Sequence, residues 1–321
     1  MIISYIFLVV GFLALLKGAD FLVDGASSVA KKLGISSLVI GLTIVAFGTS
    51  APELIVNIFA SLQGNTDIAI GNILGSNIAN ILLILGISAV IFPLSVTSGT
   101  VWKEIPLSLL AIAVMGILAN DMLIDKNGFS AITRIDGLIL ISFFIIFLYY
   151  TFGISKVDPG EGPSIKTTSS WVSFFKIIFG LVALTIGGKL IVDSAVAIAS
   201  AFGVSQALIG LTIVAVGTSL PELATSAMAA YRKQSDIAVG NIVGSNIFNI
   251  FWILGANAVI NPLPFSSFLM RDVIATIIAT LALFFVMFIG KKHVIERWQG
   301  FVFILLYAGY IGLLIFQEIS G

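Results

Sequence analysis

The 321-residue chain contains no cysteine, which excludes disulfide bonds, thiolate metal sites and cysteine-based catalysis. Its single histidine, His293, lies beside Lys291 and Lys292, as expected of a polar loop rather than a metal site. Charged residues make up 10% of the sequence, against about 25% in a typical soluble protein. The formal net charge is zero, so no basic field is present to hold a nucleic acid. These shortages exclude a soluble enzyme, a disordered chain and a nucleic-acid-binding protein.

Apolar residues, in contrast, make up 59% of the sequence, and the mean hydropathy is +1.15. A helix needs about 20 apolar residues to cross a bilayer core of about 30 Å. The chain is therefore predicted to be an all-α integral membrane protein that lies in the lipid bilayer. Ten transmembrane helices are predicted, at residues 2–26, 37–62, 68–92, 104–120, 134–153, 172–200, 206–231, 237–260, 272–290 and 298–317.

The sequence contains an internal repeat with an offset of 169 residues. Residues 41–50 read GLTIVAFGTS and residues 210–219 read GLTIVAVGTS, so nine of ten positions match. Residues 67–78 and 236–247 match at ten of twelve positions with the same offset. A duplicated unit of five helices is the simplest origin of this pattern.

The repeat predicts a first five-helix unit at residues 1–153, a cytoplasmic linker at 154–171 and a second unit at 172–321. Because five is odd, the second unit must enter the membrane from the opposite side. Inverted-topology repeats of this kind are typical of secondary transporters, whose substrate sites lie near the bilayer midplane between the repeats.

The orientation in the membrane follows from the basic residues, which concentrate in cytoplasmic loops. The odd-numbered connections hold eleven of them and the even-numbered connections hold three. We therefore predict a multi-pass protein of the cell membrane with both termini outside. The eleven are Lys31, Lys32, Lys103, Lys156, Lys166, Lys176, Arg232, Lys233, Lys291, Lys292 and Arg297; the three are Lys126, Arg134 and Arg271.

The second helix of each repeat carries Gly-Thr-Ser-x-Pro-Glu, at residues 48–53 and 217–222. Proline cannot donate a hydrogen bond to the carbonyl four residues earlier, so Pro52 and Pro221 are expected to break both helices. Unpaired carbonyls at this depth are tolerated where they line a cavity or find another partner. The motif therefore predicts a polar site inside the membrane.

Each motif ends in a carboxylate, Glu53 or Glu222, and intramembrane carboxylates usually face a pathway or a charged partner. A structural salt bridge is the alternative. Lys17 and Lys189 are the available bases, but they do not occupy equivalent repeat positions, whereas the two glutamates do. We therefore assign both glutamates to a functional site.

The third helix of each repeat carries Gly-Ser-Asn-x-x-Asn, which places Ser76 and Asn80, and likewise Ser245 and Asn249, on one helix face. Four further asparagines recur in both repeats, and we interpret them as bridges between helices and leave them outside the site: Asn72, Asn77, Asn241 and Asn246.

The chemistry that recurs in both repeats consists of oxygen ligands alone, as hard cations such as Ca²⁺ prefer. The spans contain no imidazole or thiolate, which argues against zinc or copper. Two glutamates match the charge of one Ca²⁺ or two Na⁺. Because no phosphate-binding loop is present, transport must be driven by an ion gradient. The residues alone predict a secondary antiporter of hard cations with no cofactor, no enzymatic activity and no obligate protein partner.

Residues 41–80 and 210–249 resemble the paired alpha repeats of sodium/calcium exchangers, in the calcium/cation antiporter superfamily. The resemblance implies exchange of Na⁺ for Ca²⁺ by alternating access, with the first helix of each half sliding against an eight-helix core. It also implies ion sites between the second, third, seventh and eighth helices. The residues that match the family's site are Glu53, Glu222, Thr49, Ser50, Thr218, Ser219, Ser76, Ser245, Asn80, Asn249, Ala46 and Ala215, the two alanines through their backbone carbonyls.

The sequence leaves three alternative functions open. A H⁺-coupled antiporter would use Glu53 or Glu222 as the proton carrier. A K⁺-dependent exchanger is disfavoured by Asn249, because potassium-dependent relatives resemble a form with aspartate there. An ion channel would need a selectivity-filter-like loop between spans, and the sequence contains none.

The predicted orientation can be tested by single cysteines, for which the cysteine-free chain needs no background removal. Cysteines at Gly64 and Gln317 are expected to react with an impermeant thiol reagent in intact cells, and a cysteine at Ser235 is not. Labelling of position 235 alone would invert the orientation.

Overall fold

The computed structural model describes residues 2–124, 129–153, 169–202 and 215–320. In this part of the chain the first half contains α1 (Ile2–Leu33), α2 (Ser37–Ile40), η1 (Gly41–Val45), α3 (Ala46–Thr49), α4 (Ala51–Leu62), α5 (Thr66–Ala79), η2 (Asn80–Ile84), α6 (Leu85–Ile91), β1 (Leu94–Ser95), η3 (Thr100–Glu104), α7 (Ile105–Leu118), α8 (Asp121–Ile124), β2 (Ala131–Ile132) and α9 (Arg134–Gly153). The second half contains α10 (Ser170–Ala201), α12 (Ala215–Gly217), α13 (Leu220–Tyr231), α14 (Ser235–Ile247), η5 (Phe248–Leu254), α15 (Gly255–Ile260), β3 (Leu263–Pro264), η6 (Ser267–Leu269), α16 (Met270–Val286), β4 (Val294–Ile295) and α17 (Arg297–Ser320).

The protein is a helical membrane protein, as the composition predicts. Within the described ranges, eight helical segments are long and apolar enough to cross a bilayer, and nine if the bent segment at residues 37–62 is one span. The predicted seventh span, 206–231, is described only from Ala215 onward, because its first part falls outside the described residues.

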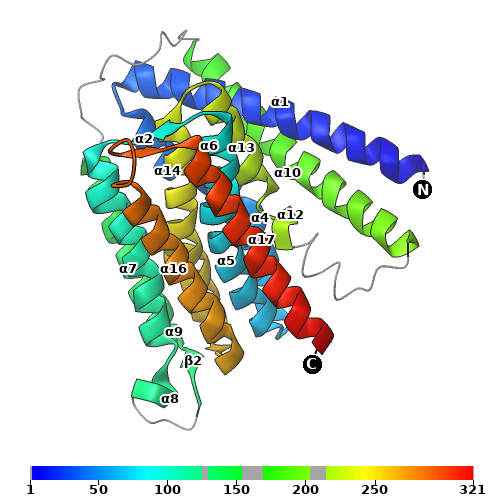
Figure 1. Cartoon of the computed structure of the whole chain (residues 1–321), viewed down its shortest axis with the longest axis vertical. Helices are drawn as coiled ribbons and strands as arrows, with labels where there is room; N and C mark the ends of the chain where they lie inside the picture. Colours follow the sequence, from blue (N-terminus) through cyan, green and yellow to red (C-terminus); the bar gives the residue numbers. More distant parts are fainter. Residues whose placement is uncertain (1, 125–128, 154–168, 203–214, 321) are drawn as a thin grey trace.

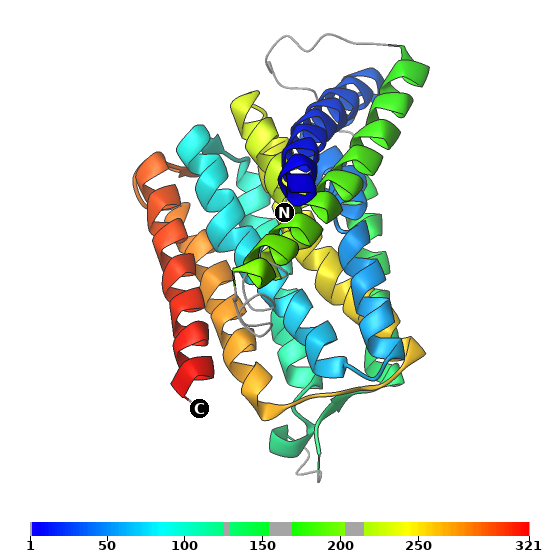
Figure 2. The same cartoon turned by 90° about the vertical axis from the view of Figure 1, so that its right-hand side faces the viewer.

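Two helical segments form the centre of the bundle. The most apolar windows of Thr66–Ile91 and Ser235–Ile260 are 78% and 94% buried, against 22–44% for the other six. Figures 1 and 2 show the remaining helices arranged around α5 and α14. The outer helices direct apolar side chains outward, which is stable only against lipid, whereas the central pair carries the buried polar residues.

Helices α1 and α10 run antiparallel, side by side and obliquely across the bundle (Figures 1 and 2). Their contact is built on glycines spaced seven residues apart. A Cβ atom on Gly18 would lie 2.9 Å from the carbonyl oxygen of Gly180, and one on Gly180 would lie 2.8 Å from that of Gly18. Gly11 and Gly187 meet in the same way. Small residues at such a seam allow two backbones to approach closely inside a membrane.

Ion pairs connect this helix pair to the rest of the molecule at one end. Lys176 on α10 contacts Asp24 on α1 at 2.5 Å between Nζ and Oδ2. Arg232, directly after α13, pairs with Asp20 and also with Asp24, the latter at 3.3 Å. These side chains are 27–32% exposed, so water screens them less than a surface pair. The antiparallel pair is therefore tied to α13 at this end.

Two short antiparallel strand pairs connect the halves of the chain. Leu94 of β1 pairs with Ile295 of β4, and Ile132 of β2 pairs with Leu263 of β3. The two strand pairs lie at opposite ends of the bundle (Figure 1). Each end of the molecule is thus closed by one segment from each half.

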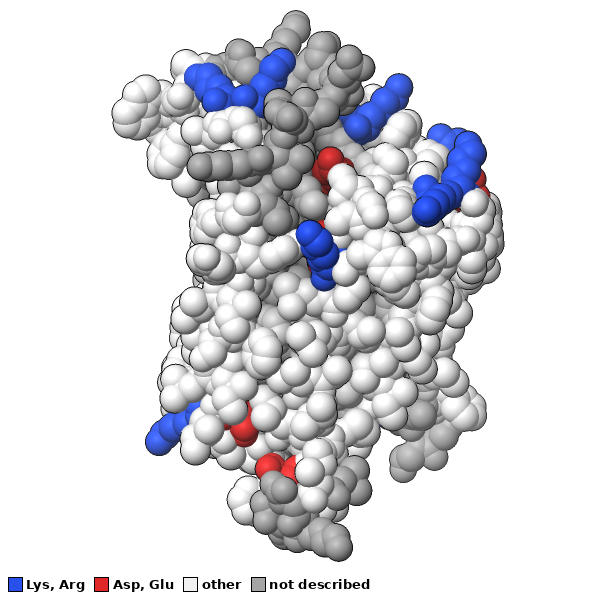
Figure 3. Space-filling view, turned by 90° about the vertical axis from the view of Figure 1, so that its left-hand side faces the viewer, with Lys and Arg blue, Asp and Glu red and all other residues white. Residues whose placement is uncertain are grey.

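Charge is distributed unevenly along the surface. Figure 3 shows lysine and arginine side chains gathered toward one end of the displayed face, above a broad band that is almost free of charge. Such a band between charged ends is the surface expected of a protein embedded in a bilayer.

Several helix boundaries differ from those predicted from sequence, among them the end of the ninth span at Val286 rather than residue 290, and two others have an evident physical reason. The fourth span begins at Thr100 rather than at residue 104, because a π-helical turn precedes Pro106 and accommodates its missing N–H. The first helix continues to Leu33 and ends before Gly34, whose φ of +62° favours glycine.

The glycine seam predicts a difference between two Gly→Ala substitutions. Gly18→Ala is expected to destabilise the protein by about 1–3 kcal/mol, because the added methyl group collides with a backbone carbonyl. Gly309→Ala, on α17, is the matched control: a Cβ there meets nothing within 4 Å. Thermal unfolding in detergent should show a lower melting temperature for the first variant only. Equal melting temperatures would contradict the close contact.

Candidate ion-binding site

The second helix of the chain is broken in the middle of its apolar run. Helix α3 ends at Thr49, Ser50 has φ −83° and ψ 5°, and α4 begins at Ala51 with a bend of 45°. Pro52, in the first turn of α4, cannot donate to the carbonyl four residues earlier, so the helix restarts there. The predicted break is confirmed.

The repeat-equivalent break lies in the second half. Helix α12 ends at Gly217, Ser219 has φ −88° and ψ 7°, and α13 begins at Leu220 with Pro221 in its first turn. The two serines that sit at the breaks thus have nearly the same backbone conformation.

Both glutamates lie just after these breaks. Glu53 is in the first turn of α4 and Glu222 in the first turn of α13, and each residue is 1% exposed. The N-terminus of a helix carries a partial positive charge, which stabilises a carboxylate placed there. Their position in the fold therefore supplies part of the stabilisation that water would otherwise give.

Neither glutamate forms an ion pair with any described residue. The two lysines considered as partners lie elsewhere: Lys17 is exposed, and the Lys189 side chain is 77% exposed and pairs with Asp193 at 3.6 Å. The structural salt bridge is therefore excluded for these two bases.

Each glutamate accepts a hydrogen bond from the other half of the chain, and Glu222 Oε1 also accepts the hydroxyl of Ser245, from its own half, at 3.4 Å. The hydroxyl of Ser50 donates to Glu222 Oε1 at 2.8 Å, and the hydroxyl of Ser219 donates to Glu53 Oε1 at 3.3 Å. The serines of the third and eighth helices join the same clusters. Ser50 lies 3.0 Å from the hydroxyl of Ser245, and Ser219 lies 3.2 Å from that of Ser76. The structure thus brings six predicted residues together as two related clusters.

Asn80 and Asn249 follow one turn beyond Ser76 and Ser245 on the same two helices. Asn80 begins the π-helical turn η2, and Asn249 is the second residue of the π-helical segment η5. Short π-helical segments inside α-helices occur frequently at functional sites. Both asparagines are 1% exposed.

Four oxygen atoms of these residues are buried and have no hydrogen-bond partner within the described part of the chain. They are Glu53 Oε2, Glu222 Oε2, Asn80 Oδ1 and Asn249 Oδ1. A buried acceptor without a donor is costly, and such an atom calls for a ligand or a functional reason. Two carboxylate and two amide oxygens, one of each from each half, form a set that a hard cation can satisfy.

The remaining predicted residues border these clusters. The hydroxyl of Thr49 donates to Asn241 Oδ1 at 3.1 Å, and that of Thr218 donates to Asn72 Oδ1 at 3.3 Å. The carbonyl oxygen of Ala46 accepts the N–H of Ser50 at 3.0 Å. Ala215 is the first residue of α12, and its side chain is outside the described part of the chain.

Two of the asparagines interpreted as simple bridges, Asn72 and Asn241, contact these threonines from the opposite half. The other two, Asn77 and Asn246, contact Asn249 and Asn80. In the sequence, the offset of 169 residues relates Asn72 to Asn241 and Asn77 to Asn246, and this recurrence is the one signal that marks these asparagines. The sequence does not indicate which residue of the opposite half each asparagine contacts.

The site contains few charges for its size. Among the described residues, no group of three or more His, Cys, Asp or Glu side chains could hold a metal ion. A cation bound here would be held by two carboxylates and by neutral oxygens.

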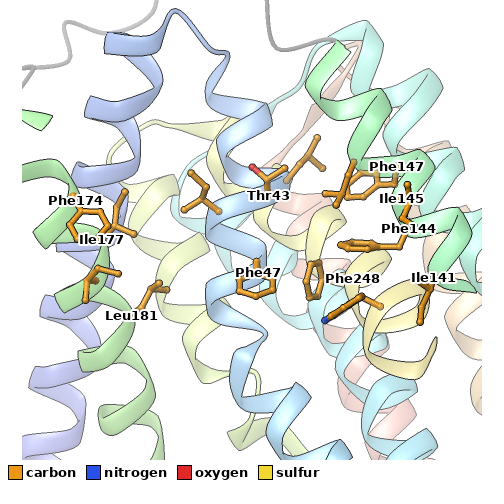
Figure 4. Close-up of a pocket in the computed structure, with 15 residues that line it drawn as sticks. Thr43, Phe47, Ile141, Phe144, Ile145, Phe147, Phe174, Ile177, Leu181 and Phe248 are labelled. Carbon is orange, nitrogen blue, oxygen red and sulfur yellow. The ribbon is translucent and has the colours of Figure 1, made fainter. Parts of the chain in front are cut away.

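A separate cavity of about 720 Å³ lies between α10, η1, α9 and η5 (Figure 4). Its lining is apolar apart from the indole N–H of Trp252 and the hydroxyl of Thr43, which donates to the carbonyl of Val39. Phe47 and Phe248 form its wall with an edge-to-face contact at 5.0 Å between ring centroids. Apart from the Thr43 hydroxyl its side chains offer no oxygen ligand, and neither Glu53 nor Glu222 lines it, so the cavity is separate from the candidate ion site.

The comparisons with known proteins cover both halves of the chain. The family described as Sodium/calcium exchanger protein matches residues 3–153 and 172–316. The inner membrane protein YrbG of Escherichia coli is 38% identical over 82% of this chain and 81% of its own length. The sodium/calcium exchanger MaX1 of Methanosarcina acetivorans is 32% identical over 98% and 99%. A solved structure of the sodium-calcium exchanger NCX_Mj, soaked with Na⁺ and Ca²⁺, has 35% identity and a TM-score of 0.83 over 97% of this chain and 98% of that one.

The geometry predicts that both glutamates are needed for Ca²⁺ binding. Glu53→Gln and Glu222→Gln are each expected to lower Ca²⁺ affinity at least about tenfold, because ligand charge sets the affinity of such sites. Glu104→Gln is the matched control: this glutamate is also 1% exposed but accepts the hydroxyl of Tyr150 outside the site. Calorimetric titration of the purified variants measures the effect. Wild-type affinity in both glutamate variants would rule out the two-carboxylate site.

Proposed function

The chain belongs to the sodium/calcium exchanger protein family and is a membrane antiporter, and we propose that it exchanges Na⁺ for Ca²⁺ across the cell membrane by alternating access. The observation that supports this most directly is the set of four buried oxygens without partners, two from carboxylates and two from amides. They belong to equivalent positions of the two halves, as expected of one central site shared by both.

The charge of the site fits these ions. Two carboxylates balance one Ca²⁺ or two Na⁺, so either cargo leaves the occupied site near neutrality. Neutrality matters because a net charge is costly inside a membrane. Exchange between the two cargoes would then change the net charge of the site little.

We propose that the transported ions are bound by the side chains around the two helix breaks and by nearby backbone carbonyls. The proposed ligands are Glu53, Glu222, Thr49, Ser50, Thr218, Ser219, Ser76, Ser245, Asn80, Asn249, Ala46 and Ala215. The hydroxyl contacts of Ser50 with Glu222 and of Ser219 with Glu53 support this set.

The proposed topology has ten transmembrane helices in two inverted five-helix repeats, residues 1–153 and 172–321, with a cytoplasmic linker at 154–171 and both termini outside. The matching breaks at Ser50 and Ser219 and the antiparallel course of α1 and α10 support an inverted relation.

The antiparallel helices α1 and α10 are proposed to move as one unit during transport. Their glycine contact joins the two helices closely to each other, and their ion pairs with Arg232 lie at one end of α13 only. Opening on one side would break these ion pairs, whereas opening on the other would keep them.

Neither K⁺ nor H⁺ is proposed as a coupling ion. Asn249 carries no charge, so the two glutamates already balance the cargo without a third cation. A H⁺-coupled exchanger remains the contrasting outcome of the following experiment.

Uptake of ⁴⁵Ca²⁺ into proteoliposomes, with gradients of Na⁺, K⁺ or H⁺ imposed one at a time, tests the proposal. We expect uptake when internal Na⁺ exceeds external Na⁺, and no acceleration by K⁺ or by a pH difference. The Glu222→Gln variant supplies the inactive control. Uptake driven by a pH difference without Na⁺ would instead identify a H⁺-coupled antiporter.

A further inference from the structure

Four buried asparagines form a closed set of hydrogen bonds between the two central helical segments. Asn80 Nδ2 donates to Asn246 Oδ1 at 2.9 Å, and Asn249 Nδ2 donates to Asn77 Oδ1 at 2.9 Å. Each residue is 1–2% exposed. Every bond in the set joins one half of the chain to the other.

The backbone determines the direction of these bonds. Asn77 Nδ2 donates to the backbone carbonyl of Asn246 at 3.3 Å, and Asn246 Nδ2 donates to the backbone carbonyl of Asn77 at 3.4 Å. A backbone carbonyl can only accept, so these two amides must direct their NH₂ groups toward it. Their side-chain oxygens therefore face away from it, where they can only accept.

The orientation of Asn77 and Asn246 in turn determines the orientation of the amides of Asn249 and Asn80. Because Asn77 and Asn246 present oxygen, Asn249 and Asn80 must present NH₂ to them. The carbonyl oxygens of Asn249 and Asn80 are then left on the opposite side, and both are buried without a partner. They lie one turn from Ser245 and Ser76, which contact the hydroxyls beside the glutamates.

We propose that Asn77 and Asn246 are positioning residues that hold the amides of Asn249 and Asn80 with oxygen toward the transported cation. The inference rests on the proposed function, since it assigns these two oxygens to the ion. It adds two residues that act on the ion through their neighbours and do not touch it.

The physical reason is that an amide has almost the same shape in either orientation but opposite polarity at its two ends. In one orientation it offers a cation an oxygen, and in the other it offers two N–H groups. Without a fixed acceptor behind it, the amide can rotate and repel the ion. The repulsion grows with ionic charge, so Ca²⁺ is disfavoured more than Na⁺.

The first variant to test is Asn246→Ala, which removes the acceptor behind Asn80. We expect its Ca²⁺ affinity to fall roughly ten- to hundredfold, as is usual when a residue that orients a metal ligand is lost. The apparent Na⁺ affinity, measured by competition, should fall less. Asn257→Ala is the matched control, because that asparagine is fully buried but donates to the carbonyl of Ile253 on its own helix.

A double-mutant cycle separates orientation from general damage to the structure. Asn80→Asp gives a side chain that offers oxygen in either orientation. In the wild-type background its oxygen would face the oxygen of Asn246, whereas in the Asn246→Ala background that conflict is absent. We expect Asn80→Asp to change Ca²⁺ affinity more favourably in the Asn246→Ala background than in the wild-type background, by roughly fivefold or more. A simple gain of charge would act equally in both.

The same cycle with Asn77→Ala and Asn249→Asp repeats the test on the other half, and it decides the question if Asn246→Ala does not fold. Melting temperatures in ion-free buffer monitor folding for every variant. Wild-type Ca²⁺ affinity in both alanine variants would overturn the proposal. It would also be overturned if each aspartate substitution changed Ca²⁺ affinity by the same factor in the alanine background as in the wild-type background.

Failure of the inference is distinct from failure of the proposed function. If Glu222→Gln loses Ca²⁺ binding while both alanine variants retain it, the site stands and the positioning role is wrong. If Glu222→Gln binds Ca²⁺ like wild type, the site itself is wrong, and the inference falls with it.

Discussion

Two carboxylates buried inside a membrane without a basic partner are the constraint on which the rest of this structure depends. Glu53 and Glu222 are 1% exposed, and no described residue forms an ion pair with either. Ionised groups in such a place need other stabilisation. The helix breaks provide helix N-termini and the serines provide hydroxyl donors, while one oxygen of each glutamate has no partner among the described residues and is proposed to bind the cation.

Each glutamate accepts a serine hydroxyl from the opposite half, and this has a structural consequence. Ser50 serves Glu222, Ser219 serves Glu53, and the amides of the two central helices cross in the same way. Neither half therefore contains a complete environment for its own glutamate. A duplicated chain whose copies meet at this point makes one site from two incomplete ones, and a movement of one half relative to the other would change the whole site.

Much of this arrangement could be predicted from sequence because it depends on local chemistry or on the repeat. Pro52 breaks its helix wherever the helix lies, and the offset of 169 residues pairs the glutamates. The rest depends on tertiary contacts that no local pattern encodes. The pairing of β1 with β4 joins residues 94 and 295, and the orientation of the four central amides follows from backbone carbonyls on another helix. The π-helical turn that moves the start of the fourth span to Thr100 has no sequence signature beyond Pro106.

The central claim is that Na⁺ and Ca²⁺ use one set of oxygens around Glu53 and Glu222. Titration of the purified protein with Ca²⁺ at several fixed Na⁺ concentrations tests it most directly. If the two ions share these oxygens, the apparent Ca²⁺ dissociation constant rises steadily with Na⁺, while the number of Ca²⁺ ions bound at saturation does not change. A Ca²⁺ affinity independent of Na⁺ would show that the two ions bind at separate sites and would contradict the account.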